Sequence, residues 1–145
     1  MSRTTGADDI ARALAELGTA IGTPVNAASR KALRPMLKAA KKNAPKDDGD
    51  LQKSLTIKRN TKAPRGVSVH VVGPASNYVG ADGAKPVRYA HITEFGTADG
   101  TVAGTRWLTR AFDETSKETL DTLGREIGPE IEKAAAKRAR RRAKK

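Results

Sequence analysis

The apolar residues of the first third of the chain recur at helical spacing. Between residues 8 and 22 they are Ile10, Leu14, Leu17 and Ile21. Steps of three and four predict a short helix, which the glycines at 18 and 22 should end. A second helix is expected from Thr23-Pro24 to Asn43, because a capping hydroxyl followed by proline favours a helix start and Pro45 disfavours helix in the residue before it. Pro35 should kink this second helix.

The middle of the chain has the pattern of short strands. Residues 51–54 predict one helical turn before a strand over 55–58. Valines at 67, 69 and 71 alternate with Ser68 and His70, which predicts a half-buried strand that Gly73-Pro74 stops. Residues 87–93 predict a third strand after Pro86. The Gly-rich stretches 74–86 and 96–105 are too long for tight hairpins, so we expect loops there.

A C-terminal helix is expected to begin near Arg106 and to be kinked or divided at Gly128-Pro129. Its apolar positions are Leu108, Ala111, Phe112, Leu120, Leu123, Ile127, Ile131 and Ala134. Helices followed by strands and a last helix indicate the α+β class. The expected architecture is a small antiparallel sheet packed by a long kinked N-terminal helix and a C-terminal helix, with a basic C-terminal tail.

Composition limits the core and the compartment. The 145 residues suit one domain, and the large aliphatic residues are sparse while Ala is plentiful. A thin core favours an assembly subunit completed by its neighbours, or a marginal monomer. No apolar run approaches the ~20 residues of a membrane span, and residues 1–30 lack the pattern of a signal peptide. We therefore expect a soluble protein that is made in the cytoplasm.

The net charge of +12 is concentrated at the C-terminus. The cations there are Lys137, Arg138, Arg140, Arg141, Arg142, Lys144 and Lys145. This divides the chain into a domain over 1–136 and a basic tail over 137–145, which we expect to be helical only where its charge is neutralised. Without interleaved aromatics, contact with nucleic acid would be to phosphates and independent of sequence. A solvated tail with no fixed partner is the alternative.

Residues suited to catalysis or to metal binding are scattered. The absence of cysteine excludes disulfides and thiolate zinc sites. His70 and His91 are the only histidines, and a metal site needs three or four convergent ligands. The acids at 47, 48 and 50 fit a turn better than an EF-hand loop, because Lys58 stands where that loop ends in Glu. We expect no enzyme activity, no cofactor and no metal.

The stretch from Pro86 to Phe112 holds the only Trp, both Phe and one of the two Tyr residues. Aromatic side chains dominate cores and interfaces, so the fold is expected to close on this stretch. Within it Glu94 lies between apolar neighbours, where an unpaired carboxylate is costly. An ion pair with Arg88, Arg106 or Arg110 that pins a turn is favoured over catalysis. The expected fold and assembly centre is Tyr89, Glu94, Phe95, Gly96, Trp107 and Phe112.

Two ordered groups of motifs resemble a known family. The first is Ala44-Pro45 followed by Asp48-Gly49-Asp50-Leu51 and Ser54. The second is Tyr89-Ala90, then Glu94-Phe95-Gly96-Thr97, then the aromatic-led start at Trp107. Over roughly residues 25–127 the chain resembles the tail-completion and head–tail joining proteins of long-tailed bacteriophages, the group that includes the lambda minor tail protein Z. The chain departs from that pattern at Asp48, Arg106 and Arg110, and the basic tail lies outside it.

The resemblance implies a structural protein of the virion neck or tail. Such a subunit forms a ring, typically of six copies, which completes the tail tube and joins it to the head connector around the DNA channel. Its expected partners are further copies of itself, the head-side connector ring and the tail tube protein. The loops 74–86 and 96–105 are the candidate contacts between subunits or rings, and Arg138, Arg140, Arg141, Arg142, Lys144 and Lys145 are the candidate contacts to channel DNA or an acidic neighbour. The alternative function is a nucleic-acid-binding protein without sequence specificity that uses its basic tail.

Overall fold

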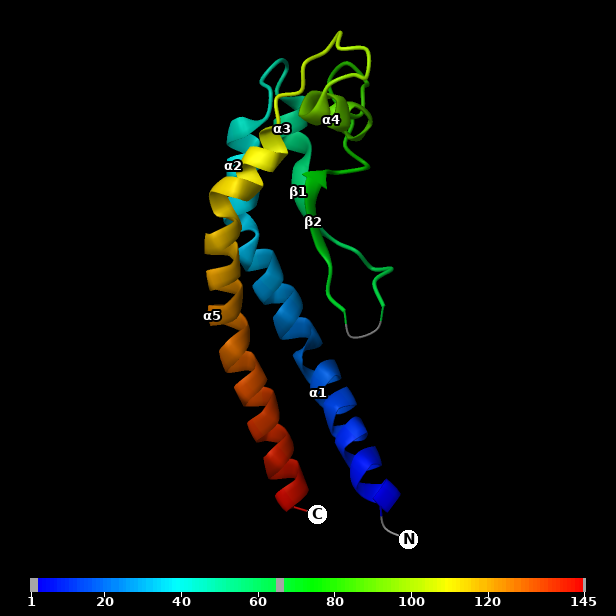
Figure 1. Cartoon of the computed structure of the whole chain (residues 1–145), viewed down its shortest axis with the longest axis vertical. Helices are drawn as coiled ribbons and strands as arrows, with labels where there is room; N and C mark the ends of the chain where they lie inside the picture. The colour runs from blue at the N-terminus through cyan, green and yellow to red at the C-terminus, as the bar shows by residue number, and fades with distance from the viewer. Residues whose placement is uncertain (1–2, 65–66, 145) are drawn as a thin grey trace.

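The computed structural model describes residues 3–64 and 67–144. Within these residues, five helices and one two-stranded sheet follow each other (Figure 1). They are α1 (Arg3–Ala32), α2 (Arg34–Asn43), α3 (Asp50–Ser54), β1 (Leu55–Arg59), β2 (His70–Pro74), α4 (Pro86–Phe95) and α5 (Trp107–Ala143). The predicted α+β class is confirmed, with a long kinked N-terminal helix, a C-terminal helix and an antiparallel sheet.

Helices α1 and α5 lie side by side as an antiparallel arm, and both termini lie at its far end (Figure 1). Polar contacts join α5 to α1 and α2 at intervals of twelve residues along α5. They are Glu114 with Asn43 at 3.4 Å, Glu126 with Lys31 at 2.6 Å, and Arg138 with Glu16 at 3.0 Å. Twelve residues of helix rise about 18 Å, so these contacts fix the register of the arm over most of its length.

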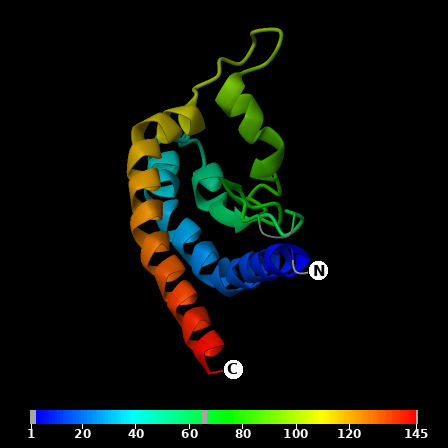
Figure 2. The ribbon, with the colours of Figure 1, turned by 60° about the horizontal axis from the view of Figure 1, so that its bottom comes forward.

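The predicted break between a short first helix and a second helix starting at Thr23-Pro24 is wrong. One helix of 30 residues passes through the glycines at 18 and 22 and contains Pro24. Glycine inside a helix costs about 1 kcal/mol relative to alanine, so these residues weaken the helix without ending it. Figure 2 shows that α1 changes direction along its length. The break at Leu33 between α1 and α2 confirms the kink predicted at Pro35, which lies in the first turn of α2.

The sheet contains two strands among the described residues, not three. Strand β1 matches the predicted strand, and it pairs antiparallel with β2 in a register that places Ile57 opposite Val72. The strand predicted over 67–71 is instead β2 over 70–74, and it includes Gly73-Pro74. Val72 is buried while Val71 is 54% exposed, because pairing with β1 decides which face of β2 meets the core. Residues 65 and 66 lie outside the described part.

The strand predicted over residues 87–93 is wrong, since this segment is helix α4. Pro86 in its first turn fixes a helical φ and needs no backbone donor there. The buried residues of α4 are Pro86, Ala90 and Glu94, four apart on one helical face. Packing of that face overrides the β propensity of the valine, tyrosine and isoleucine between them.

The core lies where α2, α3, the sheet, α4 and the first turns of α5 meet. Its buried members are Met36, Ala40, Ala44, Leu51, Leu55, Ile57, Val72, Ala90, Trp107 and Ala111. Trp107 is 1% exposed and its indole N–H donates to the Thr93 hydroxyl at 3.1 Å. Alanines supply much of this set, as the composition predicted, so the core is small for a chain of this length.

Helix α5 begins where predicted and continues for 37 residues. Gly128-Pro129 does not divide it. Pro129 and Arg125 are both exposed, so the carbonyl group that proline leaves without its helical donor can be hydrated. The helix also passes the expected boundary between residues 136 and 137. The division into a domain and a basic tail stays a prediction.

Candidate assembly and DNA-contact surfaces

The C-terminal end of α4 caps the N-terminus of α5. Glu94, 4% exposed, accepts hydrogen bonds from the backbone N–H groups of Leu108 at 2.7 Å and Thr109 at 3.0 Å. The Thr109 hydroxyl donates to the same carboxylate at 2.5 Å. The first N–H groups of a helix have no partner within the helix, and a carboxylate there also meets the positive end of the helix dipole. We call this connection the Glu94 corner.

The prediction that Glu94 forms an ion pair is wrong. Among the described residues, no arginine lies within salt-bridge distance of its carboxylate. Burial alone would raise the pKa of Glu94. The hydrogen bonds from Thr109 and Leu108, together with the charge of Arg106, outweigh burial and hold this pKa below its ordinary value. The carboxylate therefore pins the turn as expected, with backbone amides instead of a guanidinium as its partners.

The loop after α4 folds back on the end of that helix. Gly96 has a φ of +82°, and a Cβ there would lie 2.5 Å from the Val102 carbonyl oxygen. Gly96 and Ala103 form an isolated antiparallel bridge. Inside the loop, hydrogen bonds from the Thr101 and Thr97 side chains lower the pKa of Asp99 to about 2. The loop over 97–106 is therefore an ordered projection with its own internal contacts.

Five of the six residues of the expected fold and assembly centre divide into an inner and an outer group, and the sixth, Gly96, forms the bridge to Ala103. Trp107 and Glu94 are buried, and Tyr89 packs against the core. Phe95 and Phe112 are 64% and 55% exposed. The Arg106 guanidinium lies 5.2 Å from the centre of the Phe95 ring, a cation–π contact. Both phenylalanines of the chain are thus on the surface near the Glu94 corner.

The loop over 74–86 is held by a buried carboxylate that sequence reasoning did not single out. Asp50, 3% exposed, accepts from the Tyr78 hydroxyl at 3.1 Å and from the Ala81 backbone N–H at 2.9 Å. Burial and then the hydrogen bond to Asp50 raise the pKa of Tyr78. A Cβ at Gly80 would overlap the Asp50 carboxylate. In the sequence, the one sign that Asp50 faces inward is its apolar neighbour Leu51.

Two exposed acids lie next to Asp50. One carboxylate oxygen from each of Asp48, Asp50 and Asp82 lies within 4.8 Å of the others. Asp48 also accepts from the Asp50 backbone N–H at 3.0 Å, which is the turn expected there. Both oxygens of Asp50 already accept from the protein, so this cluster orders a turn and a loop.

The two histidines lie in different surroundings. His70 is half-buried, and its Nδ1 lies 3.4 Å from the Ser68 hydroxyl, which in turn donates to Asn26 at 2.6 Å. Burial, then Arg30 and Arg59, lower the pKa of His70. His91 is exposed on α4.

The predicted basic tail forms the end of α5. Arg138 is turned toward α1, where it meets Glu16 and keeps 25% of its side chain exposed. Arg140, Arg141, Arg142 and Lys144 are exposed, and Lys145 lies outside the described residues. The part of the chain that the structure describes includes no helix both long and apolar enough to cross a membrane.

One family model matches residues 8–96 of the chain, and its description is "Bacteriophage HK97-gp10, putative tail-component". The chain belongs to this HK97-gp10-like family. Neither a search of curated proteins nor a search of solved structures finds a protein that matches it.

Membership of the HK97-gp10-like family confirms the resemblance to phage tail proteins and supports a structural protein related to the phage tail. The matched residues run from α1 to the end of α4 and include the Asp50 cluster and Glu94. The matched range ends at Gly96, before the loop and α5. The partner groups of the Glu94 corner and the basic helix end therefore come from this chain's own sequence beyond the match.

Proposed function

We propose that the protein is a non-enzymatic subunit of a ring in the virion neck, which completes the tail tube and joins it to the head connector around the DNA channel. The family match over residues 8–96 carries the proposal at the level of a phage tail component. In this proposal the subunit works by assembly, in about six copies, and needs no cofactor.

The exposed aromatic surface near the Glu94 corner supports a contact between copies. Large exposed apolar patches on a soluble chain mark interaction surfaces, and aromatic side chains with arginine are enriched in them. Here Phe95 and Arg106 are in contact beside the ordered loop that folds back on Gly96, and Phe112 is exposed in the second turn of α5. Closed rings are the ordinary result of head-to-tail contacts between identical subunits.

The mass of the purified full-length protein tests the ring. Native mass spectrometry is expected to find a closed oligomer near six times the 15.4 kDa of the chain. Phe95→Ser should shift the population to monomers. Ile10→Ser is the matched control, because Ile10 is also 64% exposed but lies on α1 at the far end of the arm.

A particle experiment tests the position. Phage that lack the gene should accumulate filled heads and separate tails, and a plasmid copy of the wild-type gene should restore joined virions. Joined, infectious particles without the protein would overturn the proposed function. A strictly monomeric protein that is also absent from purified virions would overturn it as well.

The alternative, a nucleic-acid-binding protein outside the virion, has one observation in its favour, which is the exposed basic end of α5. Detection of the protein in purified particles separates the two functions, because only the neck subunit should be retained there at fixed stoichiometry.

A further inference from the structure

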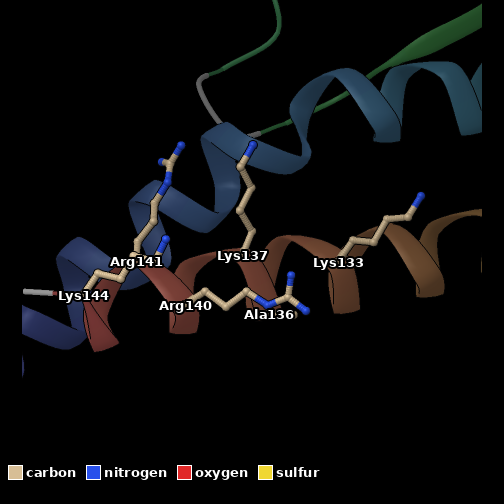
Figure 3. Close-up of a pocket in the computed structure, with 6 residues that line it drawn as sticks. All are labelled: Lys133, Ala136, Lys137, Arg140, Arg141 and Lys144. Carbon is tan, nitrogen blue, oxygen red and sulfur yellow. The ribbon is translucent and has the colours of Figure 1, made fainter.

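Five of the cations near the end of α5 lie on one side of the helix, while Arg138 and Arg142 fall outside that side. Lys133, Lys137, Arg140, Arg141 and Lys144 line a shallow groove together with Ala136 (Figure 3). At 100° per residue these five cations fall within an arc of about 100° around the helix axis. We call these five residues the basic face. A regular helix has therefore gathered charges that a flexible tail would have spread apart.

The chain compensates little of this charge itself. Lys133 is paired with Glu130 at 3.1 Å, one helical turn earlier. Among the described residues, Lys137, Arg140, Arg141 and Lys144 have no acidic side chain within salt-bridge distance. Arg138, on a neighbouring side of the helix, is bound to Glu16 and holds this end of α5 against α1. Four like charges on one ordered face repel each other, and binding of a polyanion would relieve that repulsion.

The composition of this helix end favours a phosphate backbone over an acidic protein. Residues 133–145 contain no acid, no aromatic and no apolar residue larger than alanine. Protein interfaces rely on buried aromatic or apolar anchors at their centre, and the basic face offers none. Contacts to phosphates need only positive charge and hydrogen-bond donors, and they carry no sequence information.

We propose that the basic face binds the phosphate backbone of duplex DNA without sequence preference. Successive cations on one side of a helix stand about 5–6 Å apart along its axis, so several can contact neighbouring phosphates together. That this DNA is the DNA of the neck channel rests on the proposed function. Binding of duplex DNA by the purified chain does not.

The test is the salt dependence of DNA binding by the full-length protein, measured by fluorescence anisotropy with two labelled duplexes of unrelated sequence. The triple variant Lys137→Gln, Arg140→Gln, Arg141→Gln removes three charges from the basic face. Its matched control, Lys38→Gln, Lys41→Gln, Lys42→Gln, removes three exposed charges from α2. Circular dichroism of both variants checks that each remains folded.

Each lost phosphate contact should reduce the slope of log affinity against log salt by about 0.9. The basic-face variant should therefore lose about 2–3 units of slope, with at least about tenfold weaker binding at low salt. The α2 variant should keep the wild-type slope, and both duplexes should bind alike.

Equal losses in the two triple variants would overturn the proposal, because binding would then follow net charge alone. Displacement of DNA by polyglutamate at the same charge concentration would also overturn it, in favour of an acidic protein partner. The ring is measured separately by mass. A ring with no DNA affinity would refute only the basic face, and a DNA-binding monomer absent from virions would refute only the neck subunit.

Discussion

Glu94 and Thr109 lie fifteen residues apart and meet at the junction of α4 and α5, where the Thr109 backbone N–H and hydroxyl both donate to the Glu94 carboxylate. This contact joins the last turn of a helix inside the family match to the first turn of a helix beyond it. This buried acid therefore helps to set the direction in which α5 leaves the core, together with the packing of Trp107 and Ala111.

Removal of the Glu94 carboxylate should destabilise the protein. Glu94→Ala leaves two N–H groups of α5 without their acceptor and should cost about 2 kcal/mol in the free energy of unfolding. Thr109→Val keeps the backbone donor and loses only the hydroxyl, so it should cost about 1 kcal/mol. Urea unfolding followed by the fluorescence of Trp107 measures both. Equal stability of Glu94→Ala and the wild type would contradict the capping role.

The Glu94 carboxylate should also make the free energy of unfolding depend on pH in the acidic range. The folded-state pKa of Glu94 is lowered from 4.5, so the unfolded chain binds more protons as pH falls through that range. Its contribution is present above pH 4.5 and is lost as the pH falls through the lowered value. Glu94→Gln should flatten the pH dependence of unfolding below about pH 4.5. An unchanged acid limb in this variant would assign the dependence to other groups.

Substitution of Gly96 should be far more damaging than substitution of a helical glycine. Gly96→Ala places a Cβ 2.5 Å from a carbonyl oxygen at a φ of +82°, which should cost about 2 kcal/mol or more. Gly124→Ala is the control, since a Cβ there meets nothing within 4 Å. Inside exposed helix it should stabilise by about 1 kcal/mol. Melting temperatures that move in the same direction would refute this account of the loop.

The loop over 74–86 should loosen when Asp50 is changed. Asp50→Ala removes the acceptor of both Tyr78 and Ala81, and we expect a loss of about 2 kcal/mol. Tyr78→Phe removes one of these hydrogen bonds and should cost about 1 kcal/mol. Hydrogen exchange at the Ala81 amide should become faster in Asp50→Ala and change little in Tyr78→Phe. Fast exchange of this amide in the wild type would show that the loop is not held.

A spectroscopic measurement on the same pair follows from its pKa. Burial and the hydrogen bond to Asp50 raise the pKa of Tyr78 above 10. Asp50→Asn removes the negative charge beside the phenol, so the pKa of Tyr78 should fall toward its ordinary value. Ultraviolet titration of the tyrosines reports this change, with Tyr78→Phe identifying the signal. An unchanged titration in Asp50→Asn would mean that burial alone sets the pKa.

The sequence predicted correctly those elements in which the buried residues are the ones that the apolar pattern marks. Strand β1 and the start of α5 were found because residues such as Leu55 and Trp107 face the core in the phase that the pattern indicates. Helix α4 was missed because its buried face includes Glu94, which no hydrophobicity pattern marks as internal. The phase of β2 was missed because it depends on pairing with β1, a contact that the sequence of β2 does not encode.

The sequence predicted some residues of the candidate site, but it did not predict which groups those residues contact. Glu94 was singled out because a carboxylate between apolar residues needs partners, but its partners are amides fourteen and fifteen residues later, across a loop. Asp50 was predicted only to lie in a turn. Its hydrogen bond from Tyr78 joins residues that are 28 positions apart. Such contacts depend on how loops fold back, and periodicity carries no information about them.

Because α5 is long and uninterrupted, the position of the basic face is sensitive to the angle of the helix at the Glu94 corner. The 37 residues of α5 extend about 55 Å, and the basic face occupies the end farthest from that corner. A tilt of the arm by about 10° there would sweep the cations through about 8 Å, roughly the width of a groove or a step between neighbouring phosphates. Small changes of angle at the Glu94 corner would thus be amplified into large displacements at the opposite tip.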